Sequence, residues 1–341
     1  MDPFGLNAAE ARSWAQSIGL PAFRGEQLVQ GIYRAGADRY ADVKGLPRDL
    51  AERLDAAGPL LPGVEVKRQE SRDGTVKSLL RLHDGKLVEC VSIPTATRHT
   101  VCVSSQVGCA VGCSFCASGL NGVERDLTPG EIVYQVVHHQ RLKPVTNVVF
   151  MGSGEPMFNY DNVLRAIRVL GEPLGLGMGR RRLTISTSGV PARIRQLAVD
   201  EPQVTLALSL HAGDDETRSK LVPLNKRWPL AEVLAAMGDY AGAVGRRATL
   251  EYVLLADANM THAHAFSLAA AARPIGAHIN LIPFNPVFET GHRRPTPDEV
   301  LLFADQLSAA GGHATVRGSR GTDIDAACGQ LKKRVDEAAP A

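Results

Sequence analysis

Three cysteines, Cys109, Cys113 and Cys116, follow one another in the spacing C-x3-C-x2-C, directly after an apolar run. Cubane iron–sulfur clusters are normally held by four thiolates, so a set of three leaves one iron open for another ligand. Two alternatives are a zinc site and buried cysteines that serve as small apolar side chains. Zinc sites usually contain separated Cys or Cys/His pairs, and the chain has no matching pair elsewhere. The spacing therefore favours an iron–sulfur cluster.

The same spacing resembles that of the radical S-adenosylmethionine (SAM) enzymes. In those enzymes the amino and carboxylate groups of SAM complete the coordination of the open iron. The resemblance implies one [4Fe-4S] cluster held by Cys109, Cys113 and Cys116, with SAM bound beside it.

Composition sets limits on the compartment and on the mode of RNA or DNA contact. The net charge of the 341-residue chain is only +2, so nucleic acid would have to be bound by local basic clusters rather than by a basic surface as a whole. Six cysteines in a chain of this length do not resemble a secreted disulfide framework. The N-terminus has no signal-peptide pattern, and no apolar run reaches the length of a membrane span. We expect a cytoplasmic protein without membrane contact. The local basic clusters that could bind nucleic acid are Arg180–Arg182, Lys226–Arg227, Arg246–Arg247, Arg293–Arg294, Arg317 with Arg320, and Lys332–Arg334.

The pattern along the chain predicts four parts. Residues 1–60 read as a small helical domain, and residues 61–99 as a β-hairpin connector. Residues 100–312 alternate between apolar strands and helices, which indicates a parallel sheet covered by helices. Residues 313–341 form a last strand and a tail, with a helix expected at 325–334. The predicted fold is therefore α/β, a partial barrel of six βα units with an N-terminal helical accessory domain.

Polar residues stand where the predicted barrel strands end. The strands are expected at 100–105, 147–151, 183–188, 204–210, 248–255 and 278–284. In parallel barrels the loops after the strands converge on one mouth, where the chemistry occurs. Each polar end alone is ordinary turn chemistry, but together with the cysteine loop they predict a pocket for a zwitterionic, ribose-bearing ligand such as SAM. The candidate ligand-binding residues are Gly154, Glu155, Ser186, Ser209, Leu210, His211 and Asn285. His211 could equally be a structural histidine bonded to a carbonyl.

Three further cysteines and one carboxylate are harder to assign. Cys90 alternates with apolar residues and is expected to be packing. Cys102 lies on the strand that leads into the cysteine loop, and Cys328 lies in a polar, Gly-flanked tail, where it is a candidate nucleophile. Glu89 either faces outward from its strand or is buried, in which case a raised pKa would suit a general base. On its pattern alone the outward orientation is favoured.

These segments together resemble the RlmN and Cfr group of radical SAM enzymes, which methylate adenosine in ribosomal and transfer RNA. The resemblance runs from the N-terminal helices to the tail. It rests on 101–109, the cysteine motif, Gly154–Pro156, Ser186–Val190, Ser209–Ala212, Ile282–Asn285 and Asp323–Gln330.

The resemblance implies a two-stage reaction that consumes two SAM molecules per methylation. One SAM methylates Cys328, and a second is cleaved to a 5′-deoxyadenosyl radical that takes hydrogen from the methylated Cys328. The resulting carbon radical adds to carbon 2 of adenine, Glu89 removes the adenine proton, and Cys102 resolves the adduct through a disulfide. The implied substrates are 23S rRNA and the tRNA adenosine next to the anticodon. An electron donor such as a flavodoxin and a monomeric state are also implied.

One position departs from the family pattern. Ser153 stands in Gly152–Pro156 where most members have methionine, which leaves the detail of the SAM pocket open. Two alternatives therefore remain at this point: a Cfr-like enzyme that methylates carbon 8, and a non-catalytic iron–sulfur protein that binds RNA.

Overall fold

The computed structural model describes residues 3–331. Its centre is a ten-stranded sheet in the order β1-β2-β3-β4-β7-β8-β9-β10-β11-β12, with β1 and β12 at its two edges. A separate two-stranded ribbon, which the sequence did not predict, pairs β5 with β6. The strands are β1 (Gly63–Glu70), β2 (Val76–Leu82), β3 (Leu87–Pro94), β4 (His99–Cys102), β5 (Gln106–Gly108), β6 (Val123–Asp126), β7 (Asn147–Phe150), β8 (Leu183–Thr187), β9 (Thr205–Ser209), β10 (Thr249–Leu254), β11 (His278–Pro283) and β12 (Ala314–Val316).

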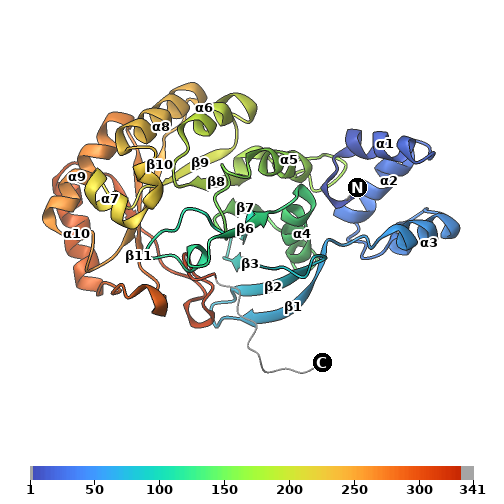
Figure 1. Ribbon diagram of the computed structural model, residues 1–341, viewed down its shortest axis with the longest axis horizontal. Coiled ribbons are helices and arrows are strands. Elements are labelled where there is room, and N and C mark those ends of the chain that lie inside the picture. Colours follow the sequence, from blue (N-terminus) through green and yellow to red (C-terminus); the bar gives the residue numbers. More distant parts are fainter. Residues whose placement is uncertain (1–2, 332–341) are drawn as a thin grey trace.

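Strands β4 and β7 to β12 run parallel to one another and form the open barrel. Their apolar side chains, such as Val148, Ile185 and Leu208, are fully buried, as expected for a parallel sheet covered by helices. Figure 1 shows α6 to α10 around the outside of this sheet. The helices of the barrel are α4 (Pro129–Gln140), α5 (Tyr160–Leu170), α6 (Pro191–Asp200), α7 (Asp215–Leu221), α8 (Leu230–Val244), α9 (His262–Ala272) and α10 (Pro297–Ala309).

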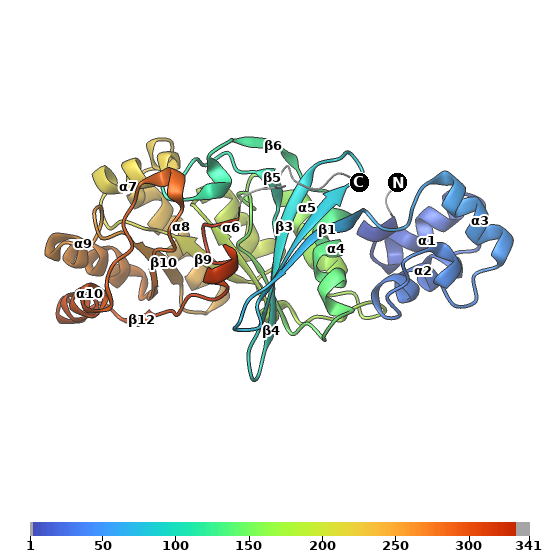
Figure 2. The ribbon, with the colours of Figure 1, turned by 90° about the horizontal axis from the view of Figure 1, so that it is seen from below.

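The N-terminal helices α1 (Ala8–Ser17), α2 (Phe23–Tyr33) and α3 (Arg48–Ala57) lie at one end of the molecule, beyond α4 (Figure 2). Asn7 and Glu10 form a capping box at the start of α1, which satisfies amide groups that the helix leaves unpaired. Phe4 joins this part to the barrel through edge-on ring contacts with Tyr33 and Tyr134.

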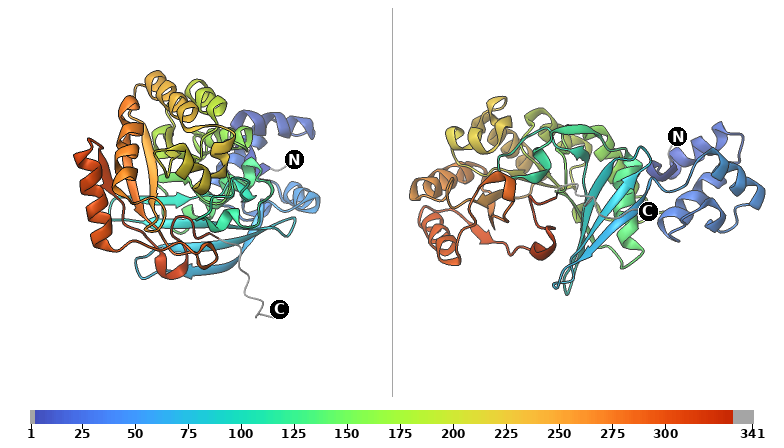
Figure 3. Two further views of the ribbon diagram at one scale, coloured as in Figure 1. Left: turned by 60° about the vertical axis from the view of Figure 1, so that its left-hand side comes forward. Right: turned by 60° about the horizontal axis from the view of Figure 1, so that its bottom comes forward.

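Strands β1 to β3 are antiparallel and extend the barrel sheet, because β3 pairs with β4. The hairpin connector expected at 61–99 is therefore part of a three-stranded wall that is continuous with the barrel. Figure 3 shows this wall beside the C-terminal segment of the described chain.

The tail does not form the predicted helix over its described part. Residues 322–324 form a single 3-10 turn, and residues 325–331 continue as turns and loop. Asp325 has a left-handed backbone with φ 52°, which a helix cannot contain. The rest of the predicted helix, and the basic residues Lys332–Arg334, lie outside the described residues. Within 3–331, no helix is both long enough and apolar enough to cross a membrane.

Candidate active site

The loops after the parallel strands meet in one cavity of about 150 Å³. Its wall contains all but one of the residues proposed from the sequence to hold the cluster or SAM, together with Cys328, Glu251 and Arg317. Leu210 is the exception, because its side chain is fully buried in the main core and does not reach the cavity. The candidate residues that line the cavity are Cys109, Cys113, Cys116, Gly154, Glu155, Ser186, Ser209, His211 and Asn285.

The three loop cysteines lie close enough to influence one another electrostatically. Burial raises the pKa of all three thiols, that of Cys109 to about 12, and the pKa of Cys113 is raised further by Cys109 and Cys116. Among the described residues, no three His, Cys, Asp or Glu side chains converge closely enough to hold one metal ion. A cubane cluster places its irons at separate corners, so its thiolates stand further apart. Three partly buried thiols on one cavity wall fit such a cluster, whose positive charge would stabilise the thiolates.

Glu155 connects the ends of the neighbouring strands β7 and β8 through hydrogen bonds. Its buried carboxylate accepts hydrogen bonds from the Thr187 hydroxyl at 2.7 Å, the Ser188 amide at 2.7 Å and the Met157 amide at 3.0 Å. Burial raises the pKa of Glu155, and these donors oppose that rise. Glu155 therefore shapes the rim between β7 and β8, in addition to lining the cavity.

Ser186 and Ser209 meet at the same mouth, with their hydroxyl oxygens 3.0 Å apart. His211 has a left-handed backbone with φ 59°, and its ring lies edge-on against Phe115 at 4.9 Å between centroids. Its Nδ1 accepts the Val253 amide at 3.1 Å, so the expected bond to a carbonyl is not the one found. Burial lowers the pKa of His211 to about 3, which keeps the ring neutral.

Ser153, the departure from the family pattern, is turned away from this cavity. Its amide donates to the Ser104 hydroxyl at 2.9 Å, and its own hydroxyl donates to the Gly108 carbonyl at 3.1 Å. Gly152 and Gly154 line the cavity on either side of it. The substitution therefore changes the support of the loop rather than the cavity wall.

Cys328 and Cys102 come together although they lie far apart in the sequence. Both line a second cavity of about 130 Å³, and Cys328 also lines the first one with the three loop cysteines. Burial raises the pKa of Cys102 to about 12. Cys328 is accessible from the cavity, yet the surrounding protein desolvates its thiol and raises its pKa, which Arg317 opposes. None of the six cysteines, all within the described residues, forms a disulfide.

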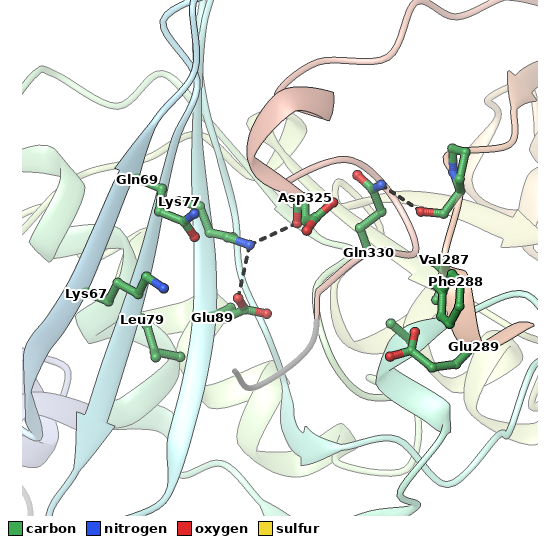
Figure 4. A pocket seen from close by; sticks show the side chains of 12 residues that line it. Lys67, Gln69, Lys77, Leu79, Glu89, Val287, Phe288, Glu289, Asp325 and Gln330 are labelled. Atoms are coloured by element: carbon green, nitrogen blue, oxygen red, sulfur yellow. Dashed lines mark hydrogen bonds and ion pairs between the residues drawn. The ribbon is translucent and has the colours of Figure 1, made fainter. Parts of the chain in front are cut away.

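Glu89 is buried rather than facing solvent, so the orientation favoured by its pattern is wrong. It lines a third cavity of about 380 Å³ between the β1–β3 wall and the tail (Figure 4). Its Oε1 lies 3.4 Å from Nζ of Lys77, and both side chains are less than 10% exposed. The cavity also contains Lys67, Phe288 and Asp325.

Comparison with known proteins agrees with this arrangement. Residues 103–268 match the model of the radical SAM superfamily. The probable dual-specificity RNA methyltransferase RlmN of Desulfitobacterium hafniense (strain DSM 10664 / DCB-2) is 44% identical, over 98% of this chain and 97% of its own. The protein of the same name from Symbiobacterium thermophilum is 45% identical, over 97% and 91%. The chain belongs to the RlmN family.

A crystal structure from the same class confirms the fold. The radical SAM methyltransferase from Sphaerobacter thermophilus superposes with a TM-score of 0.92 at 44% identity, over 96% of this chain and 98% of that one. The chain is thus a radical SAM methyltransferase with a partial α/β barrel, and its cofactors are a [4Fe-4S] cluster and SAM. The non-catalytic alternative is set aside.

Arg218 is the main residue at the site of this RlmN-family chain that sequence reasoning missed. It is fully buried beneath the cavity and donates to the carbonyls of Leu210 at 3.1 Å and Ser188 at 2.6 Å, and to Asn225 Oδ1 at 2.8 Å. Burial lowers its pKa to about 10, so it remains charged at neutral pH. It thereby ties the ends of β8 and β9 to α7. The sequence contains no signal for this role, because Arg218 stands among charged and polar residues in α7.

Replacing Arg218 with methionine is expected to lower the free energy of unfolding by about 3 kcal/mol, because buried acceptors lose their charged donor. Denaturant unfolding of the two proteins measures the difference. Lys220→Met on the same helix is the matched control, since Lys220 forms only an exposed ion pair with Glu216. Equal unfolding midpoints for the two variants would contradict this role.

Proposed function

We propose that the chain methylates carbon 2 of adenosine in 23S rRNA and in tRNA at the adenosine next to the anticodon. The observation that carries the proposal is the position of Cys328. It lies on the wall shared by the cavity of the three loop cysteines and the cavity of Cys102. A carbon attached to its sulfur can thus be reached from the SAM side, and the sulfur itself can be reached from Cys102.

Cys328 is the proposed methyl carrier. When bound, the [4Fe-4S] cluster supplies the electron for reductive cleavage of SAM. Arg317 favours the ionised, nucleophilic form of the Cys328 sulfur, which supports its methylation by displacement. Asn285 donates to the Cys328 carbonyl at 3.4 Å and accepts from Arg294 at 3.1 Å, which helps to fix the tail segment. The cavity residues Gly154, Glu155, Ser186, Ser209 and His211 are proposed to hold SAM.

Glu89 and Cys102 are proposed to complete the transfer. Glu89 would remove the proton from carbon 2 of adenine, and its burial in the cavity beside the tail supports that role. Cys102, having lost its thiol proton, would attack the sulfur of Cys328. The bond from that sulfur to the transferred carbon breaks, the carbon takes up a proton to become the methyl group of the released RNA, and the two cysteines form a disulfide. Both cysteines line one cavity, which supports this exchange.

The basic clusters are less available for RNA than the sequence suggested. Several of their arginines are engaged within the protein, which argues against one continuous phosphate-binding surface formed by them. Arg180 pairs with Glu201, Arg246 donates to the Val204 carbonyl, Arg247 to the Gly276 carbonyl, and Arg293 pairs with Glu299. We propose that RNA enters over the Glu89 cavity, whose lining includes Lys67, Lys77 and Phe288.

Phe288 is proposed to stack on a nucleobase next to the target adenosine. It is 95% exposed on the rim of the Glu89 cavity, and unstacked bases of RNA bind to such aromatic faces. Phe288→Ala should raise the KM for RNA about tenfold with little change in the maximal rate, because one stacking contact contributes about 1–3 kcal/mol. Steady-state methylation assays measure both constants. Phe288→Trp is the matched control and should keep the KM, and an unchanged KM in the alanine variant would exclude the contact.

The cellular setting is also a proposal. The number and spacing of the cysteines, which are unlike a secreted disulfide framework, support a reducing compartment, which we propose is the cytoplasm. We further propose that the protein acts as a monomer and receives electrons from a donor such as a flavodoxin.

Nucleoside analysis of RNA from a strain that lacks the gene tests the proposed function. We expect 2-methyladenosine to disappear from 23S rRNA and from tRNA, and to return when the gene is restored. Loss of 8-methyladenosine instead would assign the carbon-8 reaction, and no change in either nucleoside would contradict the proposal.

A further inference from the structure

The Glu89 cavity contains a lysine that joins two separate parts of the site. Nζ of Lys77 on β2 lies 3.4 Å from Glu89 Oε1 on β3. The same ammonium group donates a hydrogen bond to the Asp325 carbonyl of the tail at 3.1 Å (Figure 4). Lys77 is 7% exposed, so both contacts are shielded from bulk water. Lysine is rarely buried without a specific partner, which indicates a role beyond surface charge.

The Asp325 carbonyl is a fixed acceptor three residues before Cys328. Asp325 has φ 52° and ψ 40°, a left-handed conformation that is uncommon for residues other than glycine. Such a backbone persists only where its surroundings hold it. The bond from Lys77 supplies one of those contacts at the turn that leads to Cys328.

Other contacts hold the tail on both sides of Asp325. On one side, Gly321 donates its amide to Asp73 at 3.0 Å, and Asp323 accepts the Ser71 hydroxyl at 2.5 Å. On the other side, Asn285 donates to the Cys328 carbonyl at 3.4 Å, the Ala117 amide donates to the Gly329 carbonyl at 2.8 Å, and Gln330 donates to the Pro286 carbonyl at 3.0 Å. Lys77 binds the segment between these anchors and is thereby placed to set the path of the chain toward Cys328.

We propose that Lys77 is a positioning residue for methyl transfer, which holds the carboxylate of Glu89 and the Cys328 segment in a fixed position relative to each other. The inference rests on the proposed function. The transfer requires that Glu89 reach the proton at the reacting carbon while that carbon is attached to Cys328. Proton transfer needs the acceptor within hydrogen-bonding reach, so a small relative shift of the two elements slows it. The ammonium group also stabilises the ionised form of the carboxylate, which is the form that accepts a proton.

The Lys77→Met variant tests the inference by comparing two products. Wild-type and variant proteins with reconstituted cluster are incubated with RNA, SAM and dithionite, and 5′-deoxyadenosine and 2-methyladenosine are quantified together. We expect RNA methylation to fall about 10- to 100-fold, whereas 5′-deoxyadenosine changes less than about threefold, since Lys77 does not line the SAM cavity. The ratio of the two products separates lost positioning from general damage to the fold, which would lower both.

Three further readouts distinguish positioning from a merely structural role. The acid limb of the pH–rate profile for single-turnover methylation should move to higher pH in Lys77→Met, because Glu89 loses a neighbouring positive charge. The other titratable groups lining this cavity are Lys67 on β1, Glu289 after β11 and Asp325 in the tail. Lys77→Arg keeps the charge and should restore at least part of the product ratio. Lys77→Met combined with Glu89→Gln should be no slower than Glu89→Gln alone.

Lys86→Met is the matched control. Lys86 follows the same strand and pairs with Glu124, but that pair is largely exposed and lies outside the cavity. This variant should keep the wild-type product ratio and pH profile. An unchanged ratio in Lys77→Met, or an equal fall of both products in Lys77→Met and Lys77→Arg, would overturn the inference. If the wild-type protein itself makes no 2-methyladenosine, the proposed function fails instead.

Discussion

Cys328→Ala is expected to abolish methylation of RNA, with a loss of at least about 1,000-fold. The expected loss is large because the side chain would carry the transferred carbon, and no other thiol on the described cavity walls occupies its place between the two cavities. The three loop cysteines that share the first cavity are expected to be committed to the cluster. Mass spectrometry of the intact protein and nucleoside analysis of the RNA measure the two methyl acceptors separately. The variant should contain neither a methylated cysteine nor methylated adenosine.

Cys90→Ala is the matched control for this loss. Cys90 is fully buried on β3, where its sulfur lies 3.4 Å from Nε2 of His139, and it lines none of the three cavities described above, so its thiol is expected to play no part in the transfer. This variant should methylate RNA at nearly the wild-type rate once it is folded. Methylated adenosine produced by Cys328→Ala would show that the carbon reaches RNA by another route.

Cys102→Ala is expected to stop the reaction one step later, with the protein covalently bound to RNA. Without the second thiol, the bond between the Cys328-linked carbon and sulfur cannot be broken by disulfide formation. Burial raises the pKa of Cys102 to about 12, so its thiol is protonated until the attack and must lose its proton within the cavity. Denaturing gel electrophoresis with labelled RNA should show an adduct that approaches one RNA per protein.

The same gel provides the contrasting result. Wild-type protein and the Cys90→Ala variant should release their RNA and show little adduct. The double variant with Cys328→Ala should show none, because the carrier is missing. Free methylated RNA released by Cys102→Ala over repeated turnovers would refute the role of Cys102.

The cysteine loop and the strand ends could be predicted from the sequence because both depend on local pattern. Continuous apolar runs predict buried parallel strands, and the carboxyl ends of such strands share one edge. Glu155, Ser186, Ser209 and Asn285 consequently line the same cavity. Leu210 does not line it, because the residue after a polar strand end can turn its side chain into the core, as it does here.

The orientation of Glu89 could not be predicted because its neighbours are apolar on both sides. Val88 and Cys90 flank it on β3, so alternation does not reveal which face meets solvent. Here one face packs on the core, and the other faces the cavity closed by the tail. The closing contacts join Asp73 to Gly321 and Lys77 to Asp325, pairs separated by 248 positions in each case.

Contacts of this kind leave no periodic signal in the sequence. The same reason explains why Arg218 escaped notice, since its carbonyl partners belong to the backbone of other strands. The prediction of a helix at 325–334 also rested on local pattern alone, and it is wrong for the described residues 325–331. The long-range bonds to the β1–β3 wall hold residues 325–331 as a loop instead.

A single-turnover experiment with labelled carbon tests directly whether Cys328 carries the carbon that is transferred to RNA. Protein whose Cys328 carries a ¹³C-methyl group is mixed with RNA, reductant and unlabelled SAM, and the nucleosides are analysed after one turnover. We expect 2-methyladenosine that contains the ¹³C label in its methyl group. Unlabelled 2-methyladenosine as the first product, or a label found only at carbon 8, would contradict it.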